Sequence, residues 1–154
     1  KMDSITDGKK EDESYYNEKL RFVKNFKQII LLVIHGATKH FENKFVHEQE
    51  VMNNITEMMM EAYLSESLSL RVEKLEGMKI PVPVYRDMLD VNIYDTANKV
   101  RKSATDAVCS FASSELLPKL VKAIEILSKV KGINIKDARR RIADKLIEDN
   151  SYKF

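Results

Sequence analysis

The placement of glycine and proline constrains this chain more than any other feature. It holds four glycines and three prolines in 154 residues, and almost all of them fall where a helix ought to stop. Between them, apolar residues recur at three- and four-residue steps, which is the period of one helical face. No run of strict apolar and polar alternation competes with this pattern. The sequence therefore predicts an all-α protein.

Two long periodic segments make up the first half. The first helix is predicted from about Ser14 to Phe41, and the second, after a break at 42–44, continues to Gly77 because no earlier residue stops it. The apolar positions that predict the buried face of the first helix are Phe22, Phe26, Ile29, Ile30, Val33, Ala37 and Phe41. Those that predict the buried face of the second are Met52, Ile55, Met59, Ala62, Tyr63 and Leu70.

Prolines and caps divide the second half. A loop is predicted from Gly77 to Pro83, because proline removes a backbone donor and biases its predecessor away from helix. The third helix follows with an apolar face of Tyr85, Leu89, Ile93, Ala97, Val100, Ala104, Val108 and Phe111. The fourth helix is predicted to be capped by Ser113 or Ser114, to carry Pro118 in its first turn and to end at Gly132. Its predicted buried face is Leu117, Leu120, Ile124 and Leu127.

A fifth, shorter helix is predicted to run to about Glu148, opened by an Asn134 and Asp137 capping pair. The complete prediction is an up-and-down bundle of four long helices plus a shorter C-terminal helix. Residues 1–13 are almost free of apolar side chains and predict a flexible leader or interdomain linker, whereas residues 14–154 form a single helical domain.

Composition excludes several classes of function. Twenty-six basic and 24 acidic residues give a net charge of +2, which supplies no field for steering nucleic acid. The longest apolar run, Ile29 to Ile34, is too short to span a bilayer. The single cysteine, Cys109, cannot form an internal disulfide and is expected to be a buried apolar side chain in a reducing cytoplasm. A first residue Lys1 in place of methionine predicts that the chain is part of a longer protein.

No catalytic, cofactor-binding or metal-binding constellation stands out. A bundle di-metal site needs Glu-x-x-His on two helices, and no histidine here has glutamate three residues before it. His47 and Glu50 are interpreted as a solvated pair, and His35 as a hydrogen-bonded core histidine. Met58 to Met60 span too wide an arc of a helix to form one binding surface, so we interpret them as packing residues.

The candidate interaction surface is the basic run Arg139, Arg140 and Arg141. It could contact phosphate or anionic lipid. Acidic residues stand four positions from Arg140, Arg141 and Lys145, where opposite charges pair along a helix, so a salt-bridged solvent face is the favoured interpretation.

Particular strings resemble one known region, the C-terminal helical extension of bacterial acyl-CoA dehydrogenases related to the very-long-chain type. The likeness runs from about Tyr15 to Phe154, and its most specific part is Lys136 to Glu148. The strings that carry it are Glu48-Gln-Glu50, Arg71-Val-Glu-Lys-Leu75, Tyr85-Arg-Asp-Met-Leu-Asp-Val-Asn-Ile-Tyr-Asp-Thr-Ala-Asn-Lys-Val100 and Lys136-Asp-Ala-Arg-Arg-Arg-Ile-Ala-Asp-Lys-Leu-Ile-Glu148.

The resemblance implies a flavoenzyme of fatty-acid β-oxidation, in which a glutamate base removes an α-proton while hydride passes from the β-carbon to FAD. The residues that do this in the family match no positions here, so the resemblance implies that they and FAD belong to an upstream catalytic part. It also implies an extension that is inactive alone and packs on that catalytic part, within a homodimeric parent. In the very-long-chain relatives the extension is associated with dimer contacts and membrane attachment.

Three alternatives remain open at this point. Docking on the catalytic part ranks above membrane binding, because the last helix mixes acids with its bases and has small alanines in its apolar stripe. A free-standing helical module that binds a protein partner or a membrane surface is the main rival. A ligand-binding bundle is the third, and copurification of a fatty acyl ligand would support it.

Overall fold

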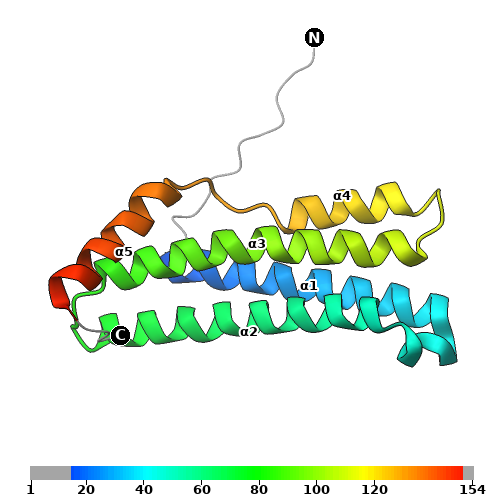
Figure 1. The fold of residues 1–154 in the computed structure, drawn as a ribbon, viewed down its shortest axis with the longest axis horizontal. Coiled ribbons are helices and arrows are strands. Elements are labelled where there is room, and N and C mark those ends of the chain that lie inside the picture. The colour runs from blue at the N-terminus through cyan, green and yellow to red at the C-terminus, as the bar shows by residue number, and fades with distance from the viewer. Residues whose placement is uncertain (1–14, 151–154) are drawn as a thin grey trace, which may run out of the picture.

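A computed structural model describes residues 15–150, all in helices and their connections. Three long helices lie side by side, each antiparallel to the next along the chain: α1 (Tyr15–Phe41), α2 (Gln49–Gly77) and α3 (Pro83–Phe111). Helix α4 (Leu117–Leu127) runs back along the second half of α3, and α5 (Ile135–Asp149) lies at an angle beside its first half (Figure 1). The predicted all-α, up-and-down bundle is confirmed. The predicted leader and the last four residues lie outside the described range.

The core lies between α1, α2 and α3. The predicted faces of α1 and α3 are confirmed: Phe26, Ile29 and Val33 of α1 and Leu89 of α3 are completely buried. Gly36 brings α1 close to the end of α3, where a Cβ atom would lie 2.6 Å from Phe111 Cε2. None of the described helices has the length and hydropathy that crossing a membrane requires.

The helix boundaries follow the local sequence signals. A 3₁₀ helix, η1 (Glu42–His47), occupies the predicted break after α1 and opens with Glu42 at φ 48°. Proline begins α3 and lies in the first turn of α4, where its missing N–H costs no helical hydrogen bond. Asn134 caps α5 as predicted, because its Oδ1 accepts the Asp137 N–H at 3.2 Å and its Nδ2 donates to Asp137 Oδ2 at 2.6 Å.

Helix α4 is shorter than the sequence suggests. It has 11 residues and ends at Leu127, five positions before Gly132. Beyond it the chain leaves the helix with Ser128 buried and Val130 packed against the core. The predicted serine cap is wrong, because the N-cap of α4 is Leu116 and no side chain caps the helix. The Ser113 hydroxyl accepts the Leu116 N–H at 3.3 Å in the turn before it.

Candidate docking surface

Helix α2 carries a stripe of large apolar side chains on its outer surface. We call Met52, Met59, Tyr63 and Leu70 the outer stripe; they are 40%, 53%, 69% and 52% exposed. Spacings of seven, four and seven residues place them on one side of a helix. Large apolar residues at helical spacing are typical of a buried face, but nothing within residues 15–150 buries this one.

The predicted buried face of α2 is therefore wrong for most of its members. Of the six residues assigned to the core, Ile55 and Ala62 are buried and the four outer-stripe residues are not. The buried positions lie further round the helix and include small polar residues. They are Val51, Ile55, Met58, Ala62, Ser65, Ser69 and Val72.

A groove of about 440 Å³ lies beside the outer stripe, between α1 and α2. Leu31 of α1 projects at its edge and is 65% exposed. The Lys27 Nζ of α1 and Glu66 Oε1 of α2 form an ion pair of 2.7 Å at the groove. The lining residues are Lys27, Ile30, Leu31, Ile34, Met59, Ala62, Tyr63 and Glu66. The groove and the outer stripe together form one apolar face, which we call the α1–α2 face.

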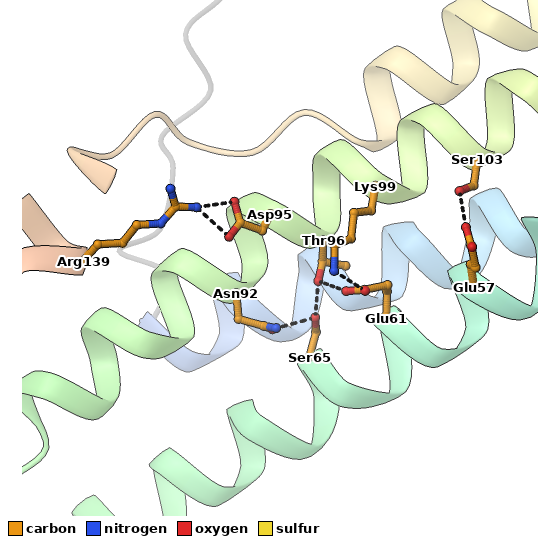
Figure 2. A network of polar contacts seen from close by, with 9 residues as sticks. All are labelled: Glu57, Glu61, Ser65, Asn92, Asp95, Thr96, Lys99, Ser103 and Arg139. Atoms are coloured by element: carbon orange, nitrogen blue, oxygen red, sulfur yellow. Dashed lines mark hydrogen bonds and ion pairs between the residues drawn. The ribbon is translucent and has the colours of Figure 1, made fainter. Parts of the chain in front are cut away.

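Polar contacts join the other side of α2 to α3 (Figure 2). The buried Ser65 hydroxyl lies 2.8 Å from Asn92 Oδ1 and 3.0 Å from Thr96 Oγ1. Thr96 in turn donates to Glu61 Oε2 at 3.1 Å. The hydrogen bond from Lys99 Nζ to Glu61 Oε1, 2.5 Å long, raises the pKa of Lys99. One helical turn along, the Ser103 hydroxyl lies 3.2 Å from Glu57 Oε2. We call these contacts the polar seam.

Two of the three arginines proposed as an interaction surface bind α3 instead. Arg139 makes a two-oxygen ion pair with Asp95, at 3.0 and 2.9 Å. Arg141 pairs with Asp87 at 2.8 and 2.5 Å, and this hydrogen bonding raises the pKa of Arg141. Arg140 is exposed. These links join α5 to α3, a role that spacing within one helix could not reveal.

The structure also tests the burial predicted for the histidines, the cysteine and the methionine run. His35 and Cys109 are exposed, so the predictions of a core histidine and a buried cysteine are wrong. Both residues have buried neighbours along their helices, but their own side chains point toward the exposed side. The three methionines are dispersed around α2 as predicted, but the interpretation of the run as packing residues holds only for Met58, which is buried, and is wrong for Met59 and Met60, which are exposed. His47 and Glu50 are both exposed, as expected of a solvated pair.

The bundle contains no grouped metal-ligand side chains within the described residues. Among residues 15–150 the one buried charged side chain is that of Lys19, which belongs to a structural cluster near the start of α1, where its Nζ lies 2.7 Å from Asp90 Oδ1. Burial and the neighbouring Asp90 raise the pKa of Tyr15 in the same cluster well above its usual range. Within residues 15–150 the structure is thus an all-α bundle that leaves a row of large apolar side chains exposed beside a groove.

The chain belongs to the family described as "Acyl-CoA dehydrogenase, C-terminal domain", whose model matches residues 25–131. It is 23% identical over 132 residues to a protein of Bacillus subtilis (strain 168) named "Probable acyl-CoA dehydrogenase", a match that covers 84% of this chain and 22% of the relative. Its fold matches an acyl-CoA dehydrogenase from Bacillus anthracis solved in complex with FAD, with a TM-score of 0.84 and 23% identity. That match covers 88% of this chain and 24% of the solved one. The chain thus spans under a quarter of either relative.

Proposed function

We propose that this chain is the non-catalytic C-terminal accessory domain of a FAD-dependent acyl-CoA dehydrogenase, and that its α1–α2 face packs against protein in that enzyme. The observation that carries the proposal is the outer stripe beside its groove. At 1.5 Å per residue the stripe is about 27 Å long. Single exposed apolar residues are normal on a protein surface, but an aligned stripe beside an apolar groove marks an interaction site.

The proposal divides the work of the enzyme between two parts. The relatives that this chain matches are dehydrogenases, and one was solved with FAD. The matched region is under a quarter of each relative, so we assign flavin binding and fatty acyl-CoA oxidation to the remainder. This domain supplies packing surface to the catalytic part of the same polypeptide or to a dimer partner, in the cytoplasm and without nucleic acid. Arg140 keeps a lesser role as a candidate contact for an anionic group.

Membrane docking through α5 is disfavoured by the contacts of its basic run. Arg139 and Arg141 are already neutralised by Asp95 and Asp87. A membrane-lying helix would need those charges free to meet lipid headgroups. Pelleting of the chain with anionic vesicles in a salt-reversible manner would reverse this ranking.

The first test concerns the reading frame upstream of Lys1 and the protein it encodes. We expect a dehydrogenase sequence continuous with this chain, and a yellow product that oxidises acyl-CoA, whereas this chain incubated with FAD should show no flavin absorbance after desalting. A reading frame that holds no dehydrogenase would overturn the proposal and favour a free-standing module.

The second test places a charge on the α1–α2 face of that longer polypeptide. Tyr63→Glu should lower its stability by about 2 kcal/mol or more, because a buried aromatic contact is replaced by a charge. Ile126→Glu is the matched control, since Ile126 is 63% exposed on α4, away from the face. Equal thermal stability of the Tyr63→Glu and Ile126→Glu proteins would contradict a buried α1–α2 face.

A further inference from the structure

We infer that the four residues after α5, Ser151 to Phe154, dock in a groove at the connection between α2 and α3 and hold the end of α5 against the bundle. We call these four residues the tail; they lie outside the described range. Three observations support the contact: the lining of the groove, the course of α5, and the sequence of the tail. The contact is independent of the proposed function, because both of its partners belong to this chain.

The groove lies where α2 ends and α3 begins, and it has a volume of about 570 Å³. We call it the turn groove. Four consecutive apolar residues, Ile80 to Pro83, form most of its lining; Val82 among them is buried and Ile80 is 38% exposed. The lining residues are Glu76, Lys79, Ile80, Pro81, Val82, Pro83 and Arg86. A groove of this composition suits apolar side chains.

The charged pair in the turn groove is already satisfied. The Arg86 Nη2 lies 2.6 and 2.7 Å from the two carboxylate oxygens of Glu76. The Tyr16 hydroxyl of α1 donates to the same carboxylate. An anionic ligand would have to compete with Glu76 for the guanidinium group, so an uncharged occupant fits this site better than an anion does.

Backbone hydrogen bonds hold the turn groove in shape. The Lys79 N–H donates to the Glu76 carbonyl at 2.8 Å, and the Ile80 N–H donates to the Leu75 carbonyl at 3.1 Å. Pro81 and Pro83 each have a φ angle fixed by the pyrrolidine ring. The groove therefore needs little ordering when it is filled, and the entropic cost of docking falls mainly on the tail.

Helix α5 carries the tail toward the turn groove. Arg139 pairs with Asp95 and Arg141 with Asp87, so α5 advances toward the start of α3 as its residue numbers rise. Asp87 directly follows a lining residue of the turn groove. Figure 1 shows the end of α5 at the same end of the bundle as the connection between α2 and α3. The tail thus starts near the groove.

The sequence of the tail matches the lining of the groove. Asn150 ends α5 in the left-handed conformation, with φ 45°, so the chain leaves the helix axis there. Tyr152 and Phe154 alternate with Ser151 and Lys153, so an extended chain would present both aromatic rings on one side. Four extended residues span about 13 Å, which exceeds the distance of about 8–10 Å between packed helix axes. The two rings can therefore reach the groove.

The first experiment places a fluorescent probe in the tail. The chain has no tryptophan, so Phe154→Trp introduces a single one. Its emission should be blue-shifted and weakly quenched by acrylamide, because the docked ring is shielded from water. Adding Ile80→Asp should red-shift the emission and raise the quenching constant several-fold, since a charge then lies in the apolar groove.

The matched control adds Ile126→Asp to Phe154→Trp. Ile126 is exposed on α4, which lies along the other half of α3, so this change should leave the emission and the quenching as they are. Neither Ile80 nor Ile126 is buried, so both aspartate variants should stay folded, and circular dichroism checks this.

The second experiment tests the contact with disulfides. Cys109 is first replaced by serine, because it is an exposed natural thiol. Ile80→Cys combined with Phe154→Cys should then form a disulfide within one chain on mild oxidation, since a disulfide needs Cα atoms within about 7 Å. Ile126→Cys combined with Phe154→Cys should not, because α4 lies away from the end of α5 (Figure 1). A non-reducing gel separates links within a chain from links between chains.

A shielded tryptophan that Ile80→Asp exposes, together with the disulfide within one chain, supports docking of the tail. A solvent-exposed tryptophan in Phe154→Trp overturns it. A shielded tryptophan that does not respond to Ile80→Asp also overturns it, because the tail would then lie elsewhere. A disulfide formed only between chains would overturn the contact within one chain. None of these outcomes decides the proposed function, which is tested by the upstream reading frame and by Tyr63→Glu.

Discussion

At the scale of single residues, Lys19 is the position where a buried charge most needs a partner, because its side chain is only 7% exposed. Its ammonium group lies 2.7 Å from Asp90 Oδ1 and 4.7 Å from the centre of the Tyr15 ring. The Tyr15 hydroxyl donates to the same carboxylate at 2.9 Å. Asp90 therefore neutralises a buried charge and accepts a hydrogen bond from a half-buried hydroxyl, so removing it should destabilise the fold more than removing one partner of an ordinary surface ion pair.

We predict that Asp90→Ala and Lys19→Met will have very different effects on stability. Removing Asp90 leaves the Lys19 charge without its nearest partner and should cost about 3 kcal/mol. Replacing Lys19 by methionine keeps the packing volume and removes the buried charge, so it should cost less than about 1 kcal/mol or stabilise the protein. Urea unfolding of both variants measures the difference. Similar losses in both would show that the ion pair itself provides most of the stability.

At the scale of helices, the closest approach is that of α1 and α3 at Gly36. A Cβ atom there would lie 2.6 and 2.9 Å from two atoms of the Phe111 ring. Gly77, the last residue of α2, has no atom within 4 Å of such a Cβ. Replacing each glycine by alanine therefore distinguishes two effects. At Gly36 the added Cβ atom meets a packing constraint, whereas at Gly77 only the general preference of helices for alanine applies.

We predict that Gly36→Ala will lower the free energy of unfolding by about 1 kcal/mol, because displacement of the Phe111 ring outweighs the gain in helix propensity. Gly77→Ala should raise the free energy of unfolding by about 0.5 kcal/mol, since the site has room and alanine restricts the unfolded chain. Thermal unfolding measures both. A stabilising Gly36→Ala would show that Phe111 moves aside at little cost.

Helix α5 is attached differently from the three long helices. Of its 15 residues, Ala138 is the one that is fully buried, while Arg139 and Arg141 reach exposed or partly exposed aspartates on α3. Exposed ion pairs contribute less than about 1 kcal/mol each and weaken as salt screens them. The part of the α5 attachment that depends on these ion pairs is thus sensitive to salt.

We predict that salt will release α5 before the rest of the bundle unfolds. Amide hydrogen exchange within residues 135–149 should accelerate between about 0.05 and 1 M NaCl, while exchange in the middle of α1–α3 stays slow. The double variant Asp87→Asn with Asp95→Asn should exchange as fast in low salt as the natural chain does in high salt. Unchanged exchange in that variant would show that apolar packing, and not charge, holds α5.

At the scale of the whole molecule, the sequence predicts the bundle well and the orientation of α2 poorly. Periodicity, capping and proline placement locate the helices because these signals are local. The buried side of α2 escapes them, because Ser65 and Ser69 look like surface residues in the sequence. In the structure the Ser65 hydroxyl has Asn92 and Thr96 of α3 as hydrogen-bond partners, and the Ser69 hydroxyl donates to the Ser65 carbonyl of α2 itself. The Arg139 and Arg141 contacts were missed for the same reason, since their partners lie 44 and 54 residues away.

The polar seam has a consequence for where the α1–α2 face points. Contacts between hydrocarbon side chains tolerate small rotations and shifts of one helix against another. Hydrogen bonds between hydroxyl and carboxylate groups form only within a narrow range of distances and angles. Turning α2 about its axis, or sliding it one turn along α3, would leave Ser65 and Thr96 buried without partners, at a cost of about 1–3 kcal/mol for each group. A seam rebuilt from alanine and valine could be as stable, yet it would let α2 settle at several angles. The polar residues of the seam thus fix the rotation of α2 about its axis, so that the outer stripe always points to the same side of the bundle.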